Sequence, residues 1–459
     1  MSRKNKMIEM KIENLEFPNR GIGSYEDKIV KVKGGIPGQK VRVKLTRSRK
    51  DHKEGKIMEI LESSPLVKEK GCAQTGICGG CAYQKLSYKD ELELKLDGVK
   101  DLFKRQNLDI DILGIEPSPV LIGYRNKMEY TFGDEEKDGP LALGLHVKGK
   151  FHGVVNTDDC NIVNQDFTII RETVRSHFEK LDLPFYYKKS HEGLLRHLVI
   201  RRSSTTEKIL VNLVTSSQIQ LDKEKFKNEL LGIDNLEGKI TGIIHTINDG
   251  LGDVVQADNT EVLFGTDIIQ EEILGLKFQI SPFSFFQTNT KGAEKLYKIA
   301  REFAGEKKER VIFDLYSGTG TIAQMMAGVS KKVIGIEIVE EAVEMARENA
   351  KLNNLTNVEF IAADVFDGVE SLPDKADLII IDPPRDGIHP KAINKIIDFN
   401  PETFVYISCN PVTLVRDLKI FEDRGYKIEK AKLMDMFPRT PHVESIILMT
   451  YCCPNIINI

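Results

Sequence analysis

The chain has 459 residues, which exceeds the roughly 250–300 residues at which a single hydrophobic core stops growing, so we expect two or three domains. Its composition, 41% hydrophobic and 29% charged, is that of a globular protein, and no apolar run approaches the roughly 20 residues that span a bilayer. The basic first six residues are followed by no apolar stretch, so we expect no signal peptide and a cytoplasmic protein.

The first segment, residues 1–62, has short alternating runs such as 29–32 and 40–45, separated by turns rich in glycine and proline. This pattern predicts a small all-β barrel. The segment holds 16 Lys and Arg against 9 Asp and Glu, although the whole chain carries a net charge of −4. The surplus favours a nucleic-acid-facing module, with an ordinary solvated surface as the alternative. Residues 34–43 resemble a TRAM domain, an OB-like module, and the resemblance implies RNA binding.

Four cysteines follow. Cys72, Cys78 and Cys81 have the spacing C-x(5)-C-x(2)-C among several glycines, and Cys160 stands far beyond them. Four thiolates suit either a 4Fe-4S cluster or tetrahedral zinc, whereas unrelated reduced thiols are the alternative. Zinc sites more often contain two C-x(2)-C pairs, so a single pair with an isolated cysteine favours iron–sulfur.

The middle of the chain begins with an amphipathic pattern over residues 89–106, which predicts a packing helix. Beyond it, β-prone runs predict a mixed α+β domain; they are 125–132, 141–146, 195–202, 209–215 and 240–248. Basic and aromatic side chains interleave here and are candidates for gripping an RNA backbone and stacking bases, although ordinary strand faces show similar patterns. They are Tyr124, Arg125, Lys127, Tyr130, Arg196, His197, Arg201 and Arg202.

From about residue 281 strands alternate with helices, which predicts a doubly wound parallel sheet. A buried strand, 311–316, leads into a glycine turn that contains Gly318. The next three strands end in Glu337, Asp364 and Asp382. The turn alone fits NAD, flavin or S-adenosylmethionine (SAM). Because there is no full G-x-G-x-x-G and three strand ends carry acids, SAM is favoured over a dinucleotide, with Glu337 placed to hold ribose hydroxyls.

The stretch Ile407-Ser408-Cys409-Asn410-Pro411 places a thiol between an apolar strand, 403–408, and a helix-like segment. Ligands bind outside the carboxyl ends of strands in open α/β sheets, so Cys409 is predicted to face the cleft. We expect the helix start to favour the thiolate and Cys409 to be a nucleophile. An inert core cysteine is the alternative.

Taken together, these motifs extend almost from end to end of the chain, which resembles the bacterial RNA (uracil-5-)-methyltransferase family. The quoted motifs are Phe285-Phe286-Gln287 followed by Asn289, Asp314 to Gly320, Asp382-Pro383-Pro384-Arg385, Ser408-Cys409-Asn410-Pro411 and His442-Val443-Glu444. The resemblance implies that Gln287, Tyr316, Glu337 and Asp382 contact SAM, that Cys409 is the nucleophile and that Glu444 is the base.

The four cysteines match the branch of this family that carries a 4Fe-4S cluster and mostly modifies 23S rRNA. The expected architecture is therefore an α/β, Rossmann-like SAM-dependent methyltransferase domain over 281–459, an OB-like TRAM barrel over 1–62, and a mixed α+β iron–sulfur domain over 63–280. The helix at 89–107 is a candidate for packing on the catalytic domain. We expect a monomer that binds RNA and no membrane.

The chemistry agrees with these roles, because carbon 5 of uracil becomes nucleophilic enough only after a thiolate adds to carbon 6. A carboxylate such as Glu444 must then remove the carbon 5 proton, and the uridine must be unpaired or flipped out. Three alternatives remain: a tRNA uridine methyltransferase, an exocyclic-amine methyltransferase, which shares the D-P-P motif but needs no cysteine, and a non-catalytic RNA-binding iron–sulfur protein.

Overall fold

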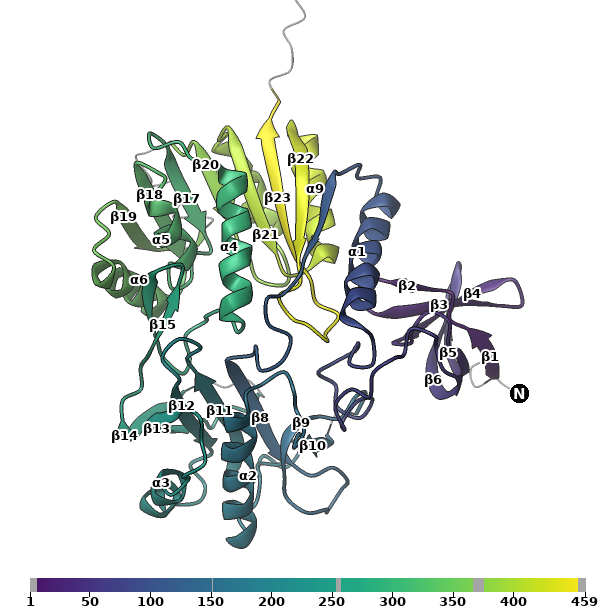
Figure 1. Cartoon of the computed structure of the whole chain (residues 1–459), viewed down its shortest axis with the longest axis vertical. Coiled ribbons are helices and arrows are strands. Elements are labelled where there is room, and N and C mark those ends of the chain that lie inside the picture. The colour runs from purple at the N-terminus through teal and green to yellow at the C-terminus, as the bar shows by residue number, and fades with distance from the viewer. Residues whose placement is uncertain (1–5, 151, 253–256, 366–374, 453–459) are drawn as a thin grey trace, which may run out of the picture.

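Strands of the described residues form four sheets, of six, seven, two and eight strands (Figure 1). The structure is a computed structural model and describes residues 6–150, 152–252, 257–365 and 375–452. Within these ranges no helix has both the length and the apolar character needed to cross a bilayer.

The first sheet has the order β1-β5-β6-β4-β3-β2. A Cβ built on Gly23 would lie only 2.2 Å from the carbonyl oxygen of Lys11, so the start of the sheet curls back against β3. Alternate side chains, among them Val41, Val43 and Leu45, form a small core of their own. The strands are β1 (Met7–Lys11), β2 (Asn14–Glu16), β3 (Arg20–Tyr25), β4 (Lys28–Lys33), β5 (Lys40–Ser48) and β6 (His52–Glu62).

The second sheet occupies the middle of the chain, in the order β10-β9-β8-β11-β12-β13-β14, and confirms the five predicted strands. Two helices, α2 (Gln165–Lys180) and α3 (Lys223–Leu231), pack on it through Phe178 and Phe226, whose rings stack 5.7 Å apart. The strands are β8 (Lys127–Gly133), β9 (Ala142–His146), β10 (Val154–Asn156), β11 (Leu195–Arg202), β12 (Lys208–Thr215), β13 (Lys239–Ile247) and β14 (Asn259–Gly265).

The largest sheet has the order β19-β18-β17-β20-β21-β23-β22-β7. Strands β17 to β21 are parallel, as predicted, and β23 is inserted antiparallel. The strands are β17 (Val311–Leu315), β18 (Lys332–Glu337), β19 (Val358–Ala362), β20 (Leu378–Ile381), β21 (Thr403–Ser408), β22 (Tyr426–Met434), β23 (Glu444–Tyr451) and β7 (Ile112–Glu116).

Helices cover both faces of this sheet, because successive strand residues such as Ile312 and Phe313 enter opposite cores. One core takes α4 (Thr290–Ala304), α5 (Thr321–Ala327) and α6 (Glu340–Leu352) together with the hairpin of β15 (Ile269–Ile273) and β16 (Leu276–Ile280). The other takes α1 (Tyr88–Arg105), α8 (Pro390–Asp398) and α9 (Pro411–Asp423).

The predicted amphipathic helix is confirmed as α1, and its buried Val99 and Phe103 lie in the second core of the large sheet. Strand β7 follows it and pairs with β22 at the edge of the same sheet, so both elements belong to the catalytic layer although they fall within residues 63–280 (Figure 1). Local sequence gives no sign of this, because the partner strand lies some 300 residues later in the chain.

Candidate functional site

The turn between β17 and α5 leaves room for a ligand. Gly318 has a φ of +53° and its α carbon faces open space, since a Cβ there would meet nothing within 4 Å. Beside it, the buried Oδ1 of Asp314 and Oγ of Ser317 have no hydrogen-bond partner within the described structure. Burial raises the pKa of Asp314 well above its usual range. These unsatisfied polar atoms are typical of a site that a polar ligand completes.

The three acids predicted at strand ends stand along one edge of the sheet. Glu337 ends β18, Asp364 follows β19 and Asp382 follows β20. The Glu337 carboxylate accepts hydrogen bonds from the backbone N–H of Gly318 at 3.0 Å, Ile338 at 2.9 Å and Val339 at 3.1 Å. It is therefore fixed in place at the mouth of the glycine turn.

Tyr316 has a φ of +63°, a left-handed backbone that brings its half-buried side chain towards the same edge. Burial, and secondarily the charges of Asp364, Asp417 and Glu337, raise the pKa of Tyr316 to about 12. Tyr316, Asp364 and Glu337 are thus neighbours, which the sequence predicted only as separate strand-end residues.

Cys409 lies between β21 and α9, as predicted, and its side chain is half-buried. Asn410 caps α9, accepting a hydrogen bond from the N–H of Val412. Its amide also donates to the carbonyl of Arg385 at 3.0 Å, and Thr413 Oγ1 donates to the same carbonyl at 3.2 Å. These contacts attach the turn that carries Cys409 to the Asp382-Pro383-Pro384-Arg385 loop.

The strand register sets Glu444 opposite Cys409. Ser408, the last residue of β21, pairs with Ser445 in the antiparallel β21–β23 ladder, so Cys409, directly after β21, comes beside Glu444, whose charge acts on the Cys409 thiol. Glu444 is buried, and burial together with the charge of Asp382 raises its pKa to about 8. Burial also raises the pKa of Asp382 to about 7. The two carboxyl groups therefore titrate close to neutral pH, the range in which a general base works best.

The start of helix α9 was expected to lower the pKa of Cys409, but other effects raise it. Burial, followed by the charges of Glu444 and Asp382, raises the pKa of Cys409 to about 12, and only the positive charge of Arg385 and a backbone hydrogen bond oppose this. Burial and the two neighbouring carboxylates therefore favour the thiol and oppose the expected effect of the helix start.

Gln287 joins the site from the segment before α4. Its side chain is hydrogen-bonded to the hydroxyl of Tyr297, and its carbonyl accepts from Asn126 at 3.1 Å. Tyr297 is buried beside the charges of Asp382, Asp314 and Glu444. Sequence reasoning missed Tyr297, since it takes an apolar position of the α4 helix and carries no motif.

Some of the RNA-gripping side chains predicted on the middle domain are engaged within the protein. Tyr130 is fully buried, Arg196 donates to the carbonyls of Asn248, Gly250 and Gly252, and Arg202 pairs with Asp166, so these three are structural and the prediction for them was wrong. For the two arginines the physical reason is that β11 is buried along nearly its whole length, so their guanidinium groups take partners within the protein.

Arg125 and Lys127, by contrast, are half-buried near the catalytic edge. Burial and the nearby charges of Arg201 and Arg125 lower the pKa of Lys127 to about 8. His442 lies two residues before Glu444, and its Nδ1 is 3.4 Å from the Arg385 guanidinium. Burial, and then cations that include Arg385 and Arg125, lower the pKa of His442. Of these cations, Arg385 acts directly on the Cys409 thiol.

The four predicted cysteine ligands lie in one neighbourhood. Ala73 donates to Asp159 at 2.9 Å, and the side chains of Gln84 and Asn161 exchange two hydrogen bonds, so the turns after Cys72 and Cys81 are joined to the segment of Cys160. Burial raises the pKa of Cys81 to about 12 and that of Cys160 to about 11, and the other thiols add to both shifts.

Across the described residues, no three His, Cys, Asp or Glu side chains are gathered as a group that would hold a metal ion. The cluster therefore remains a prediction. The donor set nevertheless fits it, because a cubane takes each thiolate on a different iron and so needs four cysteines grouped around it, not converging on one point.

Comparison with known proteins agrees with this geometry. Residues 185–451 match the family model for tRNA (uracil-5-)-methyltransferase. A protein of Clostridium tetani, described as an uncharacterized RNA methyltransferase, is 53% identical over 446 residues, covering 97% of this chain and 98% of its own length. A similarly described protein of Caldanaerobacter subterraneus subsp. tengcongensis is 49% identical over 449 residues, covering 97% of this chain and 99% of its own.

Among solved structures, the tRNA (uracil-54, C5)-methyltransferase of Pyrococcus abyssi, crystallised in complex with S-adenosyl-L-homocysteine, superposes with a TM-score of 0.73 at 27% identity. The match covers 96% of this chain and all of the other. With the family model matching more than half of the chain and close relatives matching nearly all of it, the chain belongs to the tRNA (uracil-5-)-methyltransferase family, a family of RNA-methylating enzymes.

Proposed function

We propose that this enzyme transfers a methyl group from SAM to carbon 5 of a specific uridine in RNA, through a covalent adduct between Cys409 and carbon 6. The observation that carries the proposal is the register that sets Glu444 opposite Cys409 at the carboxyl edge of the sheet. An exocyclic-amine methyltransferase needs neither side chain, and a non-catalytic protein has no use for two acids whose pKa values are raised to neutral.

SAM supplies the methyl group, and this chain offers a fitting site for it. The open space beside Gly318 and the unsatisfied oxygens of Asp314 and Ser317 suit a bound polar cofactor. We assign Gln287, Tyr316, Glu337, Asp364 and Asp382 as its contacts. Glu337, at the end of β18, would accept hydrogen bonds from the ribose hydroxyls. The exposed side chains of Ile338 and Val339, which follow it, would offer an apolar surface for the adenine ring.

In the reaction, the Cys409 thiol gives its proton to water, and the thiolate adds to carbon 6, which places negative charge on the ring as an enolate and makes carbon 5 nucleophilic. The positive charge of Arg385 favours the thiolate during this step. After methyl transfer, Glu444 removes the proton from carbon 5, and the electron pair of that carbon–hydrogen bond restores the ring double bond as Cys409 leaves. The raised pKa makes Glu444 a stronger base than an exposed glutamate.

Two substitutions test these roles. Cys409→Ala should abolish methylation and leave SAM affinity within a few fold, because the thiol acts on the base. Glu444→Gln should instead accumulate a denaturation-resistant protein–RNA adduct with ordinary uridine and SAM, since the adduct forms but cannot eliminate. Wild-type protein should form a lasting adduct with 5-fluorouridine RNA. Turnover by Cys409→Ala near the wild-type rate would refute the mechanism, and free turnover by Glu444→Gln would assign the base elsewhere.

We infer further that Cys72, Cys78, Cys81 and Cys160 hold a 4Fe-4S cluster. Grouping of the four thiols around joined turns supports this. Protein purified without oxygen should be brown and contain about four irons per chain, the content of one cubane. Stoichiometric zinc without iron would contradict the assignment, and Cys160→Ser should lower the iron content if Cys160 is the fourth ligand.

The substrate that we propose is 23S rRNA, bound by a monomer in the cytoplasm with the TRAM-like, OB-like barrel of residues 1–62 and the middle domain holding the RNA. A tRNA is the second candidate, because the family model and the Pyrococcus abyssi structure both name tRNA as the substrate of those proteins. Mapping 5-methyluridine in rRNA and tRNA from cells that lack this protein distinguishes the two, since only the true substrate loses the modification.

A further inference from the structure

The segment between β22 and β23, residues 435–443, ends directly on Glu444 and is attached mainly to other parts of the chain. Asn289 donates to the carbonyl of Met436 at 2.8 Å, Lys95 donates to that of Phe437 at 3.4 Å and Tyr124 donates to that of Pro438 at 2.9 Å. The position of the proposed base therefore depends on contacts made outside the catalytic sheet.

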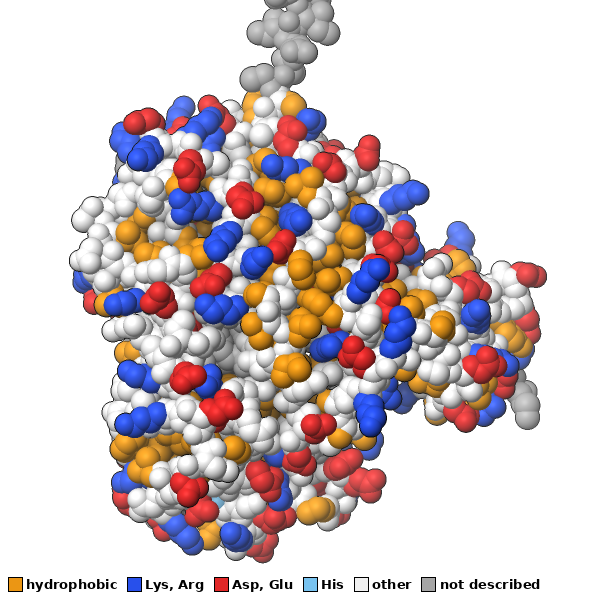
Figure 2. Space-filling model, viewed as in Figure 1, with side chains coloured by type: hydrophobic (Ala, Val, Ile, Leu, Met, Phe, Trp, Pro, Cys, Tyr) orange, Lys and Arg blue, Asp and Glu red, His pale blue; other side chains and the backbone are white. Residues whose placement is uncertain are grey.

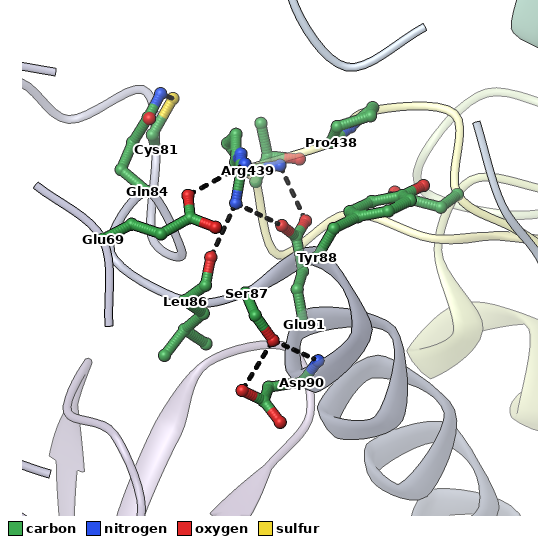
Figure 3. A network of polar contacts seen from close by, with 12 residues as sticks. Glu69, Cys81, Gln84, Leu86, Ser87, Tyr88, Asp90, Glu91, Pro438 and Arg439 are labelled. Carbon is green, nitrogen blue, oxygen red and sulfur yellow. Dashed lines mark hydrogen bonds and ion pairs between the residues drawn. The ribbon is translucent and has the colours of Figure 1, made fainter. Parts of the chain in front are cut away.

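Arg439 makes the largest set of these contacts (Figure 3). Its guanidinium donates to the carbonyl of Leu86 at 2.8 Å and to the carboxylate of Glu69 at 3.2 Å. Its backbone N–H donates to Glu91 Oε1 at 2.7 Å, and its carbonyl accepts from Ala82 at 2.9 Å and Tyr83 at 3.0 Å. Arg439 thus connects the catalytic segment to α1 and to the residues that directly follow Cys81.

The backbone of Arg439 confirms that these contacts hold it. Its φ of +71° lies in the left-handed region, which residues other than glycine adopt mainly where their surroundings enforce it. The side chain is almost buried, and the guanidinium is 3.7 Å from Glu91 Oε2. Without these contacts, we expect residue 439 to leave the left-handed backbone conformation.

Three further charges complete a buried group around Arg439. Lys95 donates to Glu91 Oε1 and to Asp435 Oδ1, both at 2.7 Å, and all three side chains are almost fully buried. Glu91 and Asp435 balance Lys95 and Arg439, so removing one cation leaves a carboxylate buried with incomplete compensation. Through these contacts both ends of the 435–439 stretch are fixed to α1.

We propose that Arg439 is a positioning residue: it fixes residues 435–443 against α1 and residues 82–86, and so holds Glu444 where it removes the carbon 5 proton. The inference rests on the proposed function for its catalytic consequence. The backbone N–H groups of Ala82 and Tyr83, in the cysteine-rich segment, donate hydrogen bonds to the carbonyl of Arg439. This segment therefore helps to hold the proposed base in place.

Arg439→Met separates this role from general damage, because it keeps much of the side-chain bulk and removes the donors. Formation of the 5-fluorouridine adduct, which needs Cys409 and SAM but no proton removal, should stay within about threefold of wild type. Turnover of ordinary uridine should fall on the order of 10- to 100-fold, the cost of displacing a catalytic group by about 1 Å. The methylated adduct should then accumulate, and Arg439→Lys should recover part of the turnover.

Arg424→Met is the matched control, because Arg424 pairs with Asp398 on the exposed surface of the same domain, and it should behave as wild type. Amide hydrogen exchange adds a readout that needs no activity: exchange at Ala82, Tyr83 and residue 439 should quicken in Arg439→Met and not in the control. Wild-type turnover without adduct, or unchanged exchange, would overturn the inference. Failure of the wild-type protein to form the 5-fluorouridine adduct would instead refute the proposed function, while the exchange data still test the attachment.

Discussion

The acid–base properties of the site are set by individual side chains. Glu444 is buried beside Asp382, and both effects raise its pKa, to about 8. Only the ionised carboxylate can accept the carbon 5 proton. Because a raised pKa keeps the group protonated until the pH passes it, the ionised form increases with pH, reaches half at about pH 8 and approaches completion only above that.

We therefore predict that resolution of the methylated adduct speeds up with pH. In single-turnover experiments with uridine RNA, the rate should rise about tenfold per unit below the pKa of Glu444 and level off above about pH 8. Adduct decay followed on denaturing gels between pH 6 and 9 measures it. A rate that is independent of pH, or that falls as pH rises, would exclude Glu444 as the base.

At the scale of elements, the turn between β17 and α5 combines two glycines with different roles. A Cβ on Gly320 would lie 2.4 Å from the ring of Phe360, and its φ is +76°, so this glycine permits close packing of helix on strand. Gly318 has a similar left-handed backbone and no neighbour within 4 Å, so its missing side chain leaves open space, which we propose that the cofactor occupies.

Alanine at the two positions should therefore have different effects. Gly320→Ala should lower the free energy of unfolding by about 2–5 kcal/mol, from left-handed backbone strain and overpacking together. Gly318→Ala should cost only about 1–2 kcal/mol of strain but weaken SAM binding markedly. Denaturant unfolding and calorimetric SAM titration measure both, with Gly328→Ala, at the open far end of α5 with φ −68°, as a neutral control. Equal SAM affinities of Gly318→Ala and wild type would place the cofactor elsewhere.

At the scale of the whole molecule, the surplus of Lys and Arg in residues 1–62 does not form a uniformly basic surface. On the face shown in Figure 2, acidic and basic side chains are interspersed over the region of strands β1 to β6. Arg42, for example, pairs with Glu9 and Glu59. Lys33, at the end of β4, and Lys148, after β9, are an exception, because both side chains are exposed and lie close enough that partial desolvation and the charge of Lys33 lower the pKa of Lys148. A phosphate bound between the two ammonium groups would relieve their repulsion.

We predict that Lys33 and Lys148 bind the RNA backbone together. The double variant Lys33→Gln/Lys148→Gln should flatten the log–log salt dependence of RNA affinity by about two units, since each phosphate contact contributes about 0.9. Lys40→Gln should leave the slope nearly unchanged, because Lys40 is paired with Glu9 and Glu62. An unchanged slope in the double variant would show that these two lysines lie on an ordinary solvated surface. Point substitutions are preferable to deletion, because Phe17 of the barrel segment packs on Gly98 of α1.

The sequence by itself determined the strands of the parallel sheet, the glycine turn, the strand-end acids and the place of Cys409 after β21. These features follow from periodicity and from the rule that parallel strands present their carboxyl ends at one edge, both of which are written locally in the chain. Even the opposition of Cys409 and Glu444 becomes predictable once the two strands are known to be neighbours.

Only the tertiary structure decided the rest. The pKa values of Cys409, Asp382 and Glu444 arise from burial and from charges on separate strands, so no local pattern contains them. Lys95 and Asp435 meet across 340 residues, and β7 finds its partner strand at a similar distance. Such contacts exist because folding brings distant segments into one core, where a buried charge must find its partner wherever in the chain that partner lies.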